Sequence, residues 1–251
     1  MVGDMTPSGS LVKAMGACVV MTAVLLPPVP AEARTIDGTA GRDILVGTHG
    51  RDRIHGLGGD DAITARGGND IARGGDGDDL IFLGPNPPPR GRIAEFGLGG
   101  RGDDWVYGKT GRDQLFGGPG NDRIYGGPQD DDLFTGPGDD LLVGGRGGDI
   151  IEDLIQGQPG KNVIRAGPGP DEILEMQDLA QDRIHAGRGD DFLSLGGDGF
   201  RDIFDCGPGK DTLELFPERD PLDSIVHCEE IVVDAKRQLR PDTPDAVEQA
   251  H

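Results

Sequence analysis

A period of nine residues governs most of this sequence. Five units run without a gap over 38–82 and six more over 99–152, and three pairs separated by short insertions follow over 157–214. Sixteen of these seventeen units have Asp at the sixth position, with Asn162 the exception, and sixteen have a large apolar residue at the eighth, with Ala72 the exception. A fixed period of this length indicates stacked repeats, each of which contacts only its neighbours.

The repeat changes what the composition implies. The chain has 45 acidic residues against 24 Lys plus Arg, a net charge of −21, and only 4% aromatic residues. Without a repeat, this composition would indicate disorder. The charge argues against nucleic acid and anionic lipid as partners, and we expect no membrane insertion. The partners that remain are cations, either as diffuse counterions or as a specific divalent metal.

Each unit divides into six turn-forming residues and three strand-forming residues. Glycines recur at positions one, two and four, where we expect backbone conformations that a Cβ forbids. Neighbouring side chains of a strand point to opposite faces, so the eighth residue points inward and its neighbours point outward. The sequence therefore predicts an all-β solenoid with a thin aliphatic core, in which these residues form internal ladders: Leu45, Ile54, Ile63, Ile81, Val106, Leu115, Ile124, Leu133, Leu142 and Ile151.

The sixth-position aspartates are the candidate metal ligands. Loops stacked at the strand spacing of about 4.8 Å align their carboxylates in rows. Within each row, neighbouring carboxylates repel each other. Ca²⁺ would neutralise such rows, because it accepts six to eight oxygen ligands, backbone carbonyls included. The predicted ligands are Asp43, Asp52, Asp61, Asp70, Asp79, Asp104, Asp113, Asp122, Asp131, Asp140, Asp149, Asp171, Asp182, Asp191, Asp202 and Asp211.

The unit Gly74–Phe82, GGDGDDLIF, matches the pattern GGxGxDxUx at every fixed position. In this the chain resembles the RTX, or haemolysin-type, calcium-binding repeat proteins. The resemblance implies a right-handed parallel β-roll with two units per coil and Ca²⁺ between units i and i+2. The implied ligand pairs are Asp43/Asp61, Asp52/Asp70, Asp61/Asp79, Asp104/Asp122, Asp113/Asp131, Asp122/Asp140 and Asp131/Asp149. Fifth-position acids, such as Asp60, Asp78, Asp103, Asp130 and Asp139, are either further ligands or, as we prefer, solvated loop charges.

The segments outside the repeat have other compositions. Residues 1–33 combine Lys13, an apolar run and Ala31-Glu32-Ala33, which favours a cleaved secretory signal over a membrane anchor and predicts a secreted protein. The proline-rich stretch 83–98 predicts a loop that bulges from the roll. We expect a cap over 215–233 and a disordered tail over 234–251.

Two cysteines remain after the predicted cleavage. Cys206 opens the last unit, and Cys228 lies in an apolar segment with Ile225, Val226, Ile231, Val232 and Val233. An even cysteine count in an exported chain favours a disulfide that caps the carboxy-terminal end, although both thiols could instead be buried and free.

No enzyme motif emerges from the sequence. It contains neither HExxH nor GxSxG, and the repeats lack the flanking helices and the twelfth-position Glu of EF-hands. The alternative is a carbohydrate-active β-solenoid enzyme of lyase or epimerase type. The outward aromatics Trp105, Tyr107, Phe116, Tyr125 and Phe134 are compatible with a stripe that binds an extracellular polysaccharide or cell-surface partner, and equally with ordinary strand cover. We predict a non-enzymatic calcium-binding protein with an extracellular structural, adhesive or interaction role.

Overall fold

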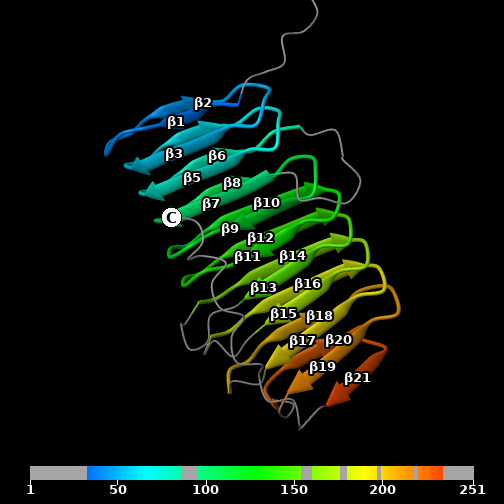
Figure 1. Ribbon diagram of the computed structural model, residues 1–251. Helices are drawn as coiled ribbons and strands as arrows, with labels where there is room; N and C mark the ends of the chain where they lie inside the picture. The colour runs from blue at the N-terminus through cyan, green and yellow to red at the C-terminus, as the bar shows by residue number, and fades with distance from the viewer. Residues whose placement is uncertain are drawn as a thin grey trace, which may run out of the picture.

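The chain forms a β-solenoid of stacked coils, shown from one side in Figure 1. The computed structural model describes residues 33–85, 95–153, 160–175, 180–196, 199–216 and 220–233. The predicted signal segment, apart from Ala33, and the predicted tail lie outside these residues. Every strand pairing is parallel, and consecutive strands alternate between two sheets. The predicted all-β parallel roll is confirmed.

We call the two sheets that the described residues form the odd sheet and the even sheet, after the numbers of their strands. The odd sheet has eleven strands: β1 (Thr35–Asp37), β3 (Arg53–Gly58), β5 (Ile71–Asp76), β7 (Glu95–Arg101), β9 (Asp113–Phe116), β11 (Asp132–Phe134), β13 (Ile150–Asp153), β15 (Glu172–Glu175), β17 (Phe192–Gly196), β19 (Thr212–Phe216) and β21 (Glu230–Val233). The even sheet has ten: β2 (Ile44–Val46), β4 (Ala62–Thr64), β6 (Leu80–Phe82), β8 (Trp105–Tyr107), β10 (Arg123–Pro128), β12 (Leu141–Arg146), β14 (Val163–Pro168), β16 (Arg183–Arg188), β18 (Ile203–Asp205) and β20 (Ser224–Val226).

The register follows the repeat. Ile124 lies beside Leu142 in the even sheet, and Leu133 lies beside Ile151 in the odd sheet, so each eighth residue pairs with the eighth residue two units later. All ten residues of the predicted core ladder are buried, and nine of them are 0% exposed. The thin aliphatic core is thus built as the nine-residue pattern predicts.

Glycine serves two different purposes within a unit. In the unit 117–125, Gly118 and Gly120 have φ of 114° and 148°, which L side chains rarely adopt. Gly117, at the first position, is not in this left-handed region. A Cβ there would instead collide with the carboxylate of Asp122. The expectation of special backbone angles therefore holds for positions two and four of this unit. At position one, glycine is needed because any side chain there would collide with the aspartate.

The predicted loop over 83–98 is wrong at both ends. Leu83 is 3% exposed and belongs to the core, and strand β7 begins at Glu95. Phe96 lies beside Ile71 and Gly97 beside Ala72, so this segment supplies an additional, degenerate unit to the odd sheet. The prolines Pro87–Pro89 lie outside the described residues.

This degenerate unit places two small residues side by side in the core. Neither Ala72 nor Gly97 fills its eighth position, and Leu83 packs beside them, with its Cδ1 3.3 Å from the position a Gly97 Cβ would take. The first-position side chain of Leu83 thus compensates for two missing eighth-position side chains.

At the carboxy-terminal end, β20 and β21 continue both sheets by one coil. Ile225 lies beside Phe204 and Ile231 beside Leu213. Cys206 and Cys228 are joined by a disulfide with an S–S distance of 1.98 Å. In the chain-entropy model, closing the loop between these two cysteines contributes roughly 3 kcal/mol to the free energy of unfolding. The segment does not bury all of its apolar residues, because Ile231 is 44% and Val233 52% exposed.

We predict that Leu83→Ala is strongly destabilising. The substitution would open a cavity beside two positions that already lack large side chains, and such changes cost about 2–5 kcal/mol. Denaturant unfolding in excess calcium would measure the loss. Leu222→Ala is the matched control, because Leu222 is 54% exposed. Equal, small effects of the two substitutions would show that Leu83 does not support the core.

Candidate functional site

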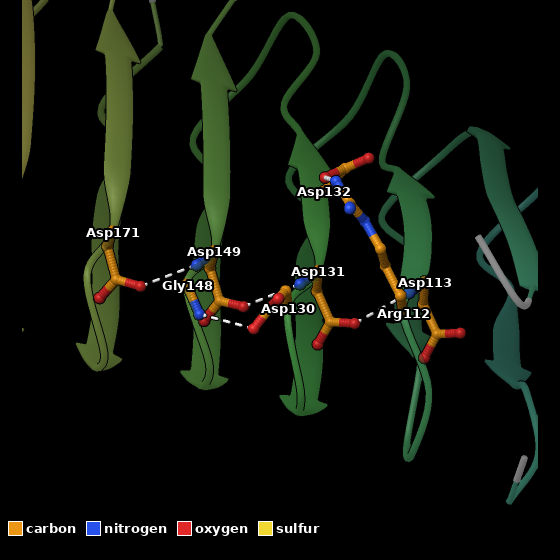
Figure 2. Close-up of polar contacts among 8 residues, drawn as sticks. All are labelled: Arg112, Asp113, Asp130, Asp131, Asp132, Gly148, Asp149 and Asp171. Atoms are coloured by element: carbon orange, nitrogen blue, oxygen red, sulfur yellow. Dashed lines mark hydrogen bonds and ion pairs between the residues drawn. The ribbon is translucent and has the colours of Figure 1, made fainter. Parts of the chain in front are cut away.

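The sixth-position carboxylates form two rows, one along each edge where the chain enters a sheet. The same hydrogen bond recurs along both rows: the backbone N–H of one sixth residue donates to Oδ1 of the sixth residue one coil later. It is interrupted before Asp113, whose Oδ1 has no partner among the described residues. Figure 2 shows this contact along Asp113, Asp131, Asp149 and Asp171. The N···O distances along this run are 2.9, 2.9 and 2.8 Å. The structure thus places a carboxylate of each coil against the backbone of the coil before it.

All seven ligand pairs implied by the family resemblance are adjacent in these rows. Their N–H···Oδ1 contacts span 2.7–2.9 Å. The later residues Asp171, Asp182, Asp191, Asp202 and Asp211 continue the same arrangement. Asn162 takes the place of an aspartate, with its Oδ1 accepting from the Asp140 N–H at 3.0 Å.

One carboxylate oxygen per aspartate has no such partner. Within the described part of the chain, Oδ2 is buried and accepts no hydrogen bond at eleven sixth-position residues: Asp61, Asp70, Asp79, Asp104, Asp113, Asp122, Asp131, Asp149, Asp171, Asp191 and Asp211. Buried polar atoms in proteins are normally paired, and an unpaired one is costly. A row of such oxygens therefore indicates that these atoms are available as ligands for a cation.

A backbone carbonyl of the next coil faces the same space. At the first-position Gly126, a Cβ would lie 2.5 Å from Oδ2 of Asp131 and 2.7 Å from the carbonyl oxygen of Gly144. The same two kinds of oxygen flank the first-position glycines Gly108 and Gly99. Glycine keeps this space open, and carboxylate and carbonyl oxygens are the ligands that Ca²⁺ takes.

The first two aspartates are arranged differently. Oδ2 of Asp43 accepts hydrogen bonds from the Thr39 N–H at 2.6 Å and hydroxyl at 2.8 Å. Oδ2 of Asp52 likewise accepts from the Thr48 N–H and from its hydroxyl, the latter at 2.9 Å. Second-position threonine thus satisfies the oxygen that stays open elsewhere. Asp140 also differs, because its Oδ2 accepts from the Gly136 N–H at 3.2 Å.

Three acids in the rows escaped the sequence analysis. Glu95 is at the sixth position of the degenerate unit, between Asp70 and Asp113. Its Oε2 accepts from the Gly84 N–H at 2.9 Å, and the side chain is 1% exposed. Asp223 and Glu229 continue the rows beyond the last recognised unit. Counting the 18-residue coil onward from Asp211 would have found Glu229.

The fifth-position acids lie at the exposed surface of the turns. Oδ1 of Asp130 accepts from the Gly148 N–H at 2.9 Å, and Asp103 accepts in the same way from Asn121 at 2.8 Å. Figure 2 shows Asp130 in this contact. These hydrogen bonds join neighbouring turns, so fifth-position acids act as links between coils.

Burial raises the pKa of eleven sixth-position carboxyls, and neighbouring carboxylates raise several of them further: Asp70, Asp79, Asp104, Asp113, Asp122, Asp131, Asp140, Asp149, Asp171, Asp191 and Asp211. The pKa of Asp104 rises to about 8 and that of Asp131 to about 9, in both cases chiefly through burial. Burial also raises the pKa of Glu95 to about 9. These values mean that the ionised rows are unfavourable in the folded protein unless a cation accompanies them.

The five outward aromatics do not form a single stripe, because Trp105, Tyr107 and Tyr125 lie on the even sheet and Phe116 and Phe134 lie on the odd sheet. On each sheet the rings stack on each other. Tyr107 and Tyr125 lie 4.8 Å apart with an interplanar angle of 5°, and Phe116 and Phe134 lie 4.4 Å apart at 7°. The ring faces that a sugar would need are therefore largely occupied by neighbouring rings. Trp105 is 40% exposed, and the Arg123 guanidinium lies 4.9 Å from its ring centroid. This arrangement favours strand cover.

Among the described residues, no group of three or more His, Cys, Asp or Glu side chains is arranged to hold a metal by itself, so a bound Ca²⁺ would need backbone oxygens as well. The same part of the chain contains no helix that is long and apolar enough to cross a membrane.

A family model for the RTX calcium-binding nonapeptide repeat matches the sequence in several overlapping segments, at residues 37–72, 55–85, 98–133, 116–151 and 180–199. A search of curated proteins found no match. The matched segments include thirteen of the sixteen predicted ligands, and all thirteen lie in the carboxylate rows.

We predict that the calcium-free roll becomes less stable as the pH rises. The raised folded pKa values contribute stability that is fully present below the unfolded value of about 3.9 and is lost as the pH rises through about 6 to about 9. The β-type circular dichroism signal of the calcium-free chain, compared at about pH 6 and about pH 8.5, would measure this loss. Excess calcium should reverse the trend, since Ca²⁺ competes with protons for the same oxygens. A calcium-free roll that gains stability over this range would contradict the burial of the carboxylates.

Proposed function

Because the chain belongs to the RTX calcium-binding nonapeptide-repeat proteins, we propose that it is a secreted, non-enzymatic protein whose roll folds around Ca²⁺ held between successive coils. The observation that carries this proposal is the row of buried Oδ2 atoms without hydrogen-bond partners. Each of these oxygens belongs to a carboxylate whose other oxygen is, in all but one case, fixed by the neighbouring coil.

The chain's own residues would prepare the site. The backbone N–H of Asp113 orients the Asp131 carboxylate, and the small Gly126 leaves open the space toward the Gly144 carbonyl. When bound, Ca²⁺ supplies the positive charge that the buried carboxylates lack and links the coils that provide its ligands. The binding free energy of the metal would then contribute to folding.

The orphaned oxygens also suggest which positions bind best. In the block 99–152, five of the six sixth-position aspartates have a buried Oδ2 without a partner. Asp43 and Asp52 have theirs occupied by threonine. We therefore propose that the central block binds Ca²⁺ more tightly than the first coil does.

An extracellular location fits this chemistry. The composition of residues 1–33 favours export, and the Cys206–Cys228 disulfide is of a kind that persists in oxidising compartments. Extracellular calcium modules typically bind at about 10⁻⁴–10⁻³ M. We propose a structural or adhesive role, for which a rigid calcium-dependent rod is suited. Binding of an extracellular polysaccharide or cell-surface partner stays a prediction.

Asp131→Asn should lower the number of calcium ions bound per chain by about one, because it removes a negative ligand from a site that takes several oxygens. Its Oδ1 can still accept the Asp113 N–H, so the hydrogen-bonded frame is preserved. Equilibrium dialysis with ⁴⁵Ca²⁺ would count the ions.

Asp130→Asn is the matched control, since it makes the same change one residue earlier, at an exposed turn position. It should bind as many ions as the unaltered chain. If both variants bind calcium as the parent does, the sixth-position row is not the binding site.

A further inference from the structure

The two outer faces of the roll carry opposite charges in its carboxy-terminal half. The even-sheet strands β10 to β20 contain five exposed arginines, at positions 123, 146, 165, 183 and 188, and a single acid, Asp205. Asp205 is contacted by His185 at 3.5 Å and by His227 at 2.8 Å. None of the five arginines forms an ion pair with another described residue. In a protein of net charge −21, this face is locally basic.

The odd sheet shows the reverse pattern across the same coils. Strands β11 to β21 contain no Lys or Arg. Their outward positions carry Glu152, Glu172, Glu214 and Glu230, in addition to Asp132, which pairs with Arg112 at 3.2 Å. Opposite sides of the same coils therefore differ in sign.

Both faces also expose apolar surface between the charges. Leu141, Val143 and Val163 are half-buried on the even sheet, and Ile150 and Phe192 are half-buried on the odd sheet. Half-exposed apolar side chains interspersed with charges of a single sign are typical of surfaces that other proteins cover. Both faces are parallel sheets with the same strand spacing of about 4.8 Å, so one can lie along the other.

We propose that the basic even face of one molecule binds the acidic odd face of a second copy. The complementary charges favour a second copy over other occupants, because one chain supplies both surfaces on coils of equal pitch. The contact joins two different patches, so it does not close on itself and each copy keeps one free face of each sign. Repetition of this contact gives side-by-side arrays of rolls.

The inference rests on the proposed function in one respect. A net charge of −21 opposes the approach of two copies, and bound Ca²⁺ lowers that charge while ordering both faces. Association is therefore expected with calcium and at low ionic strength, and salt should weaken it by screening the facing charges.

Sedimentation velocity on the full chain in excess calcium tests the contact. The unaltered protein should form oligomers whose fraction rises with concentration and falls with added salt. Arg165→Glu combined with Arg183→Glu should reduce the association constant by about tenfold or more, since like charges would then face each other. Arg51→Glu combined with Arg53→Glu makes the same charge change away from the proposed contact and should leave association intact.

A complementary variant sharpens the test. Glu172→Arg combined with Glu230→Arg should also weaken self-association, because two arginines beside the remaining Glu152 and Glu214 would remove the negative charge of the odd face. Mixing it with the Arg165→Glu, Arg183→Glu protein should restore association, because the unaltered acidic odd face of one variant can then meet the unaltered basic even face of the other. Equal losses in the Arg51/Arg53 control, or no recovery on mixing, would overturn the assignment of the faces.

Circular dichroism of the same samples separates this inference from the proposed function. A β-type spectrum that requires calcium, from a chain that remains monomeric at every salt concentration, would overturn the self-association and leave calcium-dependent folding intact. A spectrum indifferent to calcium would instead count against the proposed function.

Discussion

A single contact, repeated along two rows, determines how the coils of this protein stack. The backbone N–H of one sixth-position residue donates to a carboxylate oxygen of the next coil, as between Asp113 and Asp131. This contact fixes the spacing between coils and satisfies one oxygen of nearly every carboxylate in the rows, Asp113 being an exception. It also buries the second oxygen, which at eleven sixth-position aspartates has no hydrogen-bond partner in the described chain. The same interaction that orders the roll therefore creates its need for a cation.

The rest of the unit can be understood from this requirement. First-position glycines such as Gly126 are small because a Cβ would collide with the aspartate oxygen, and the later glycines permit the turn that brings the aspartate to the edge of the sheet. The core consists of little more than one aliphatic residue per unit, such as Ile124 or Leu133. So small an apolar core offsets only part of the backbone entropy lost on folding, which is about 1–2 kcal/mol per residue. The carboxylate rows must therefore contribute correspondingly more to the stability of the fold.

The sequence predicted the repeating part of the structure well, because one residue type at one position has one physical role there. The sixth-position Asp and the eighth-position aliphatic residue predicted both the rows and the core ladder. The degenerate unit was missed because Glu95 and Gly97 break the pattern at both of its diagnostic positions, after an insertion that hides the period. The role of Thr39 and Thr48 was also missed, since a hydroxyl that competes for a carboxylate oxygen is visible only once the turn is folded. The opposite charges of the two faces follow an 18-residue period, which is not apparent in single nine-residue units.

The central claim is that the carboxylate rows make the folded roll depend on calcium. Circular dichroism of the purified chain during a calcium titration, followed by excess chelator, tests it most directly. We expect little ordered structure without calcium at neutral pH, a cooperative gain of β-type signal as calcium is added, and loss of that signal when the chelator removes it. A β-type spectrum that is already complete without calcium and unchanged by chelator would contradict the account.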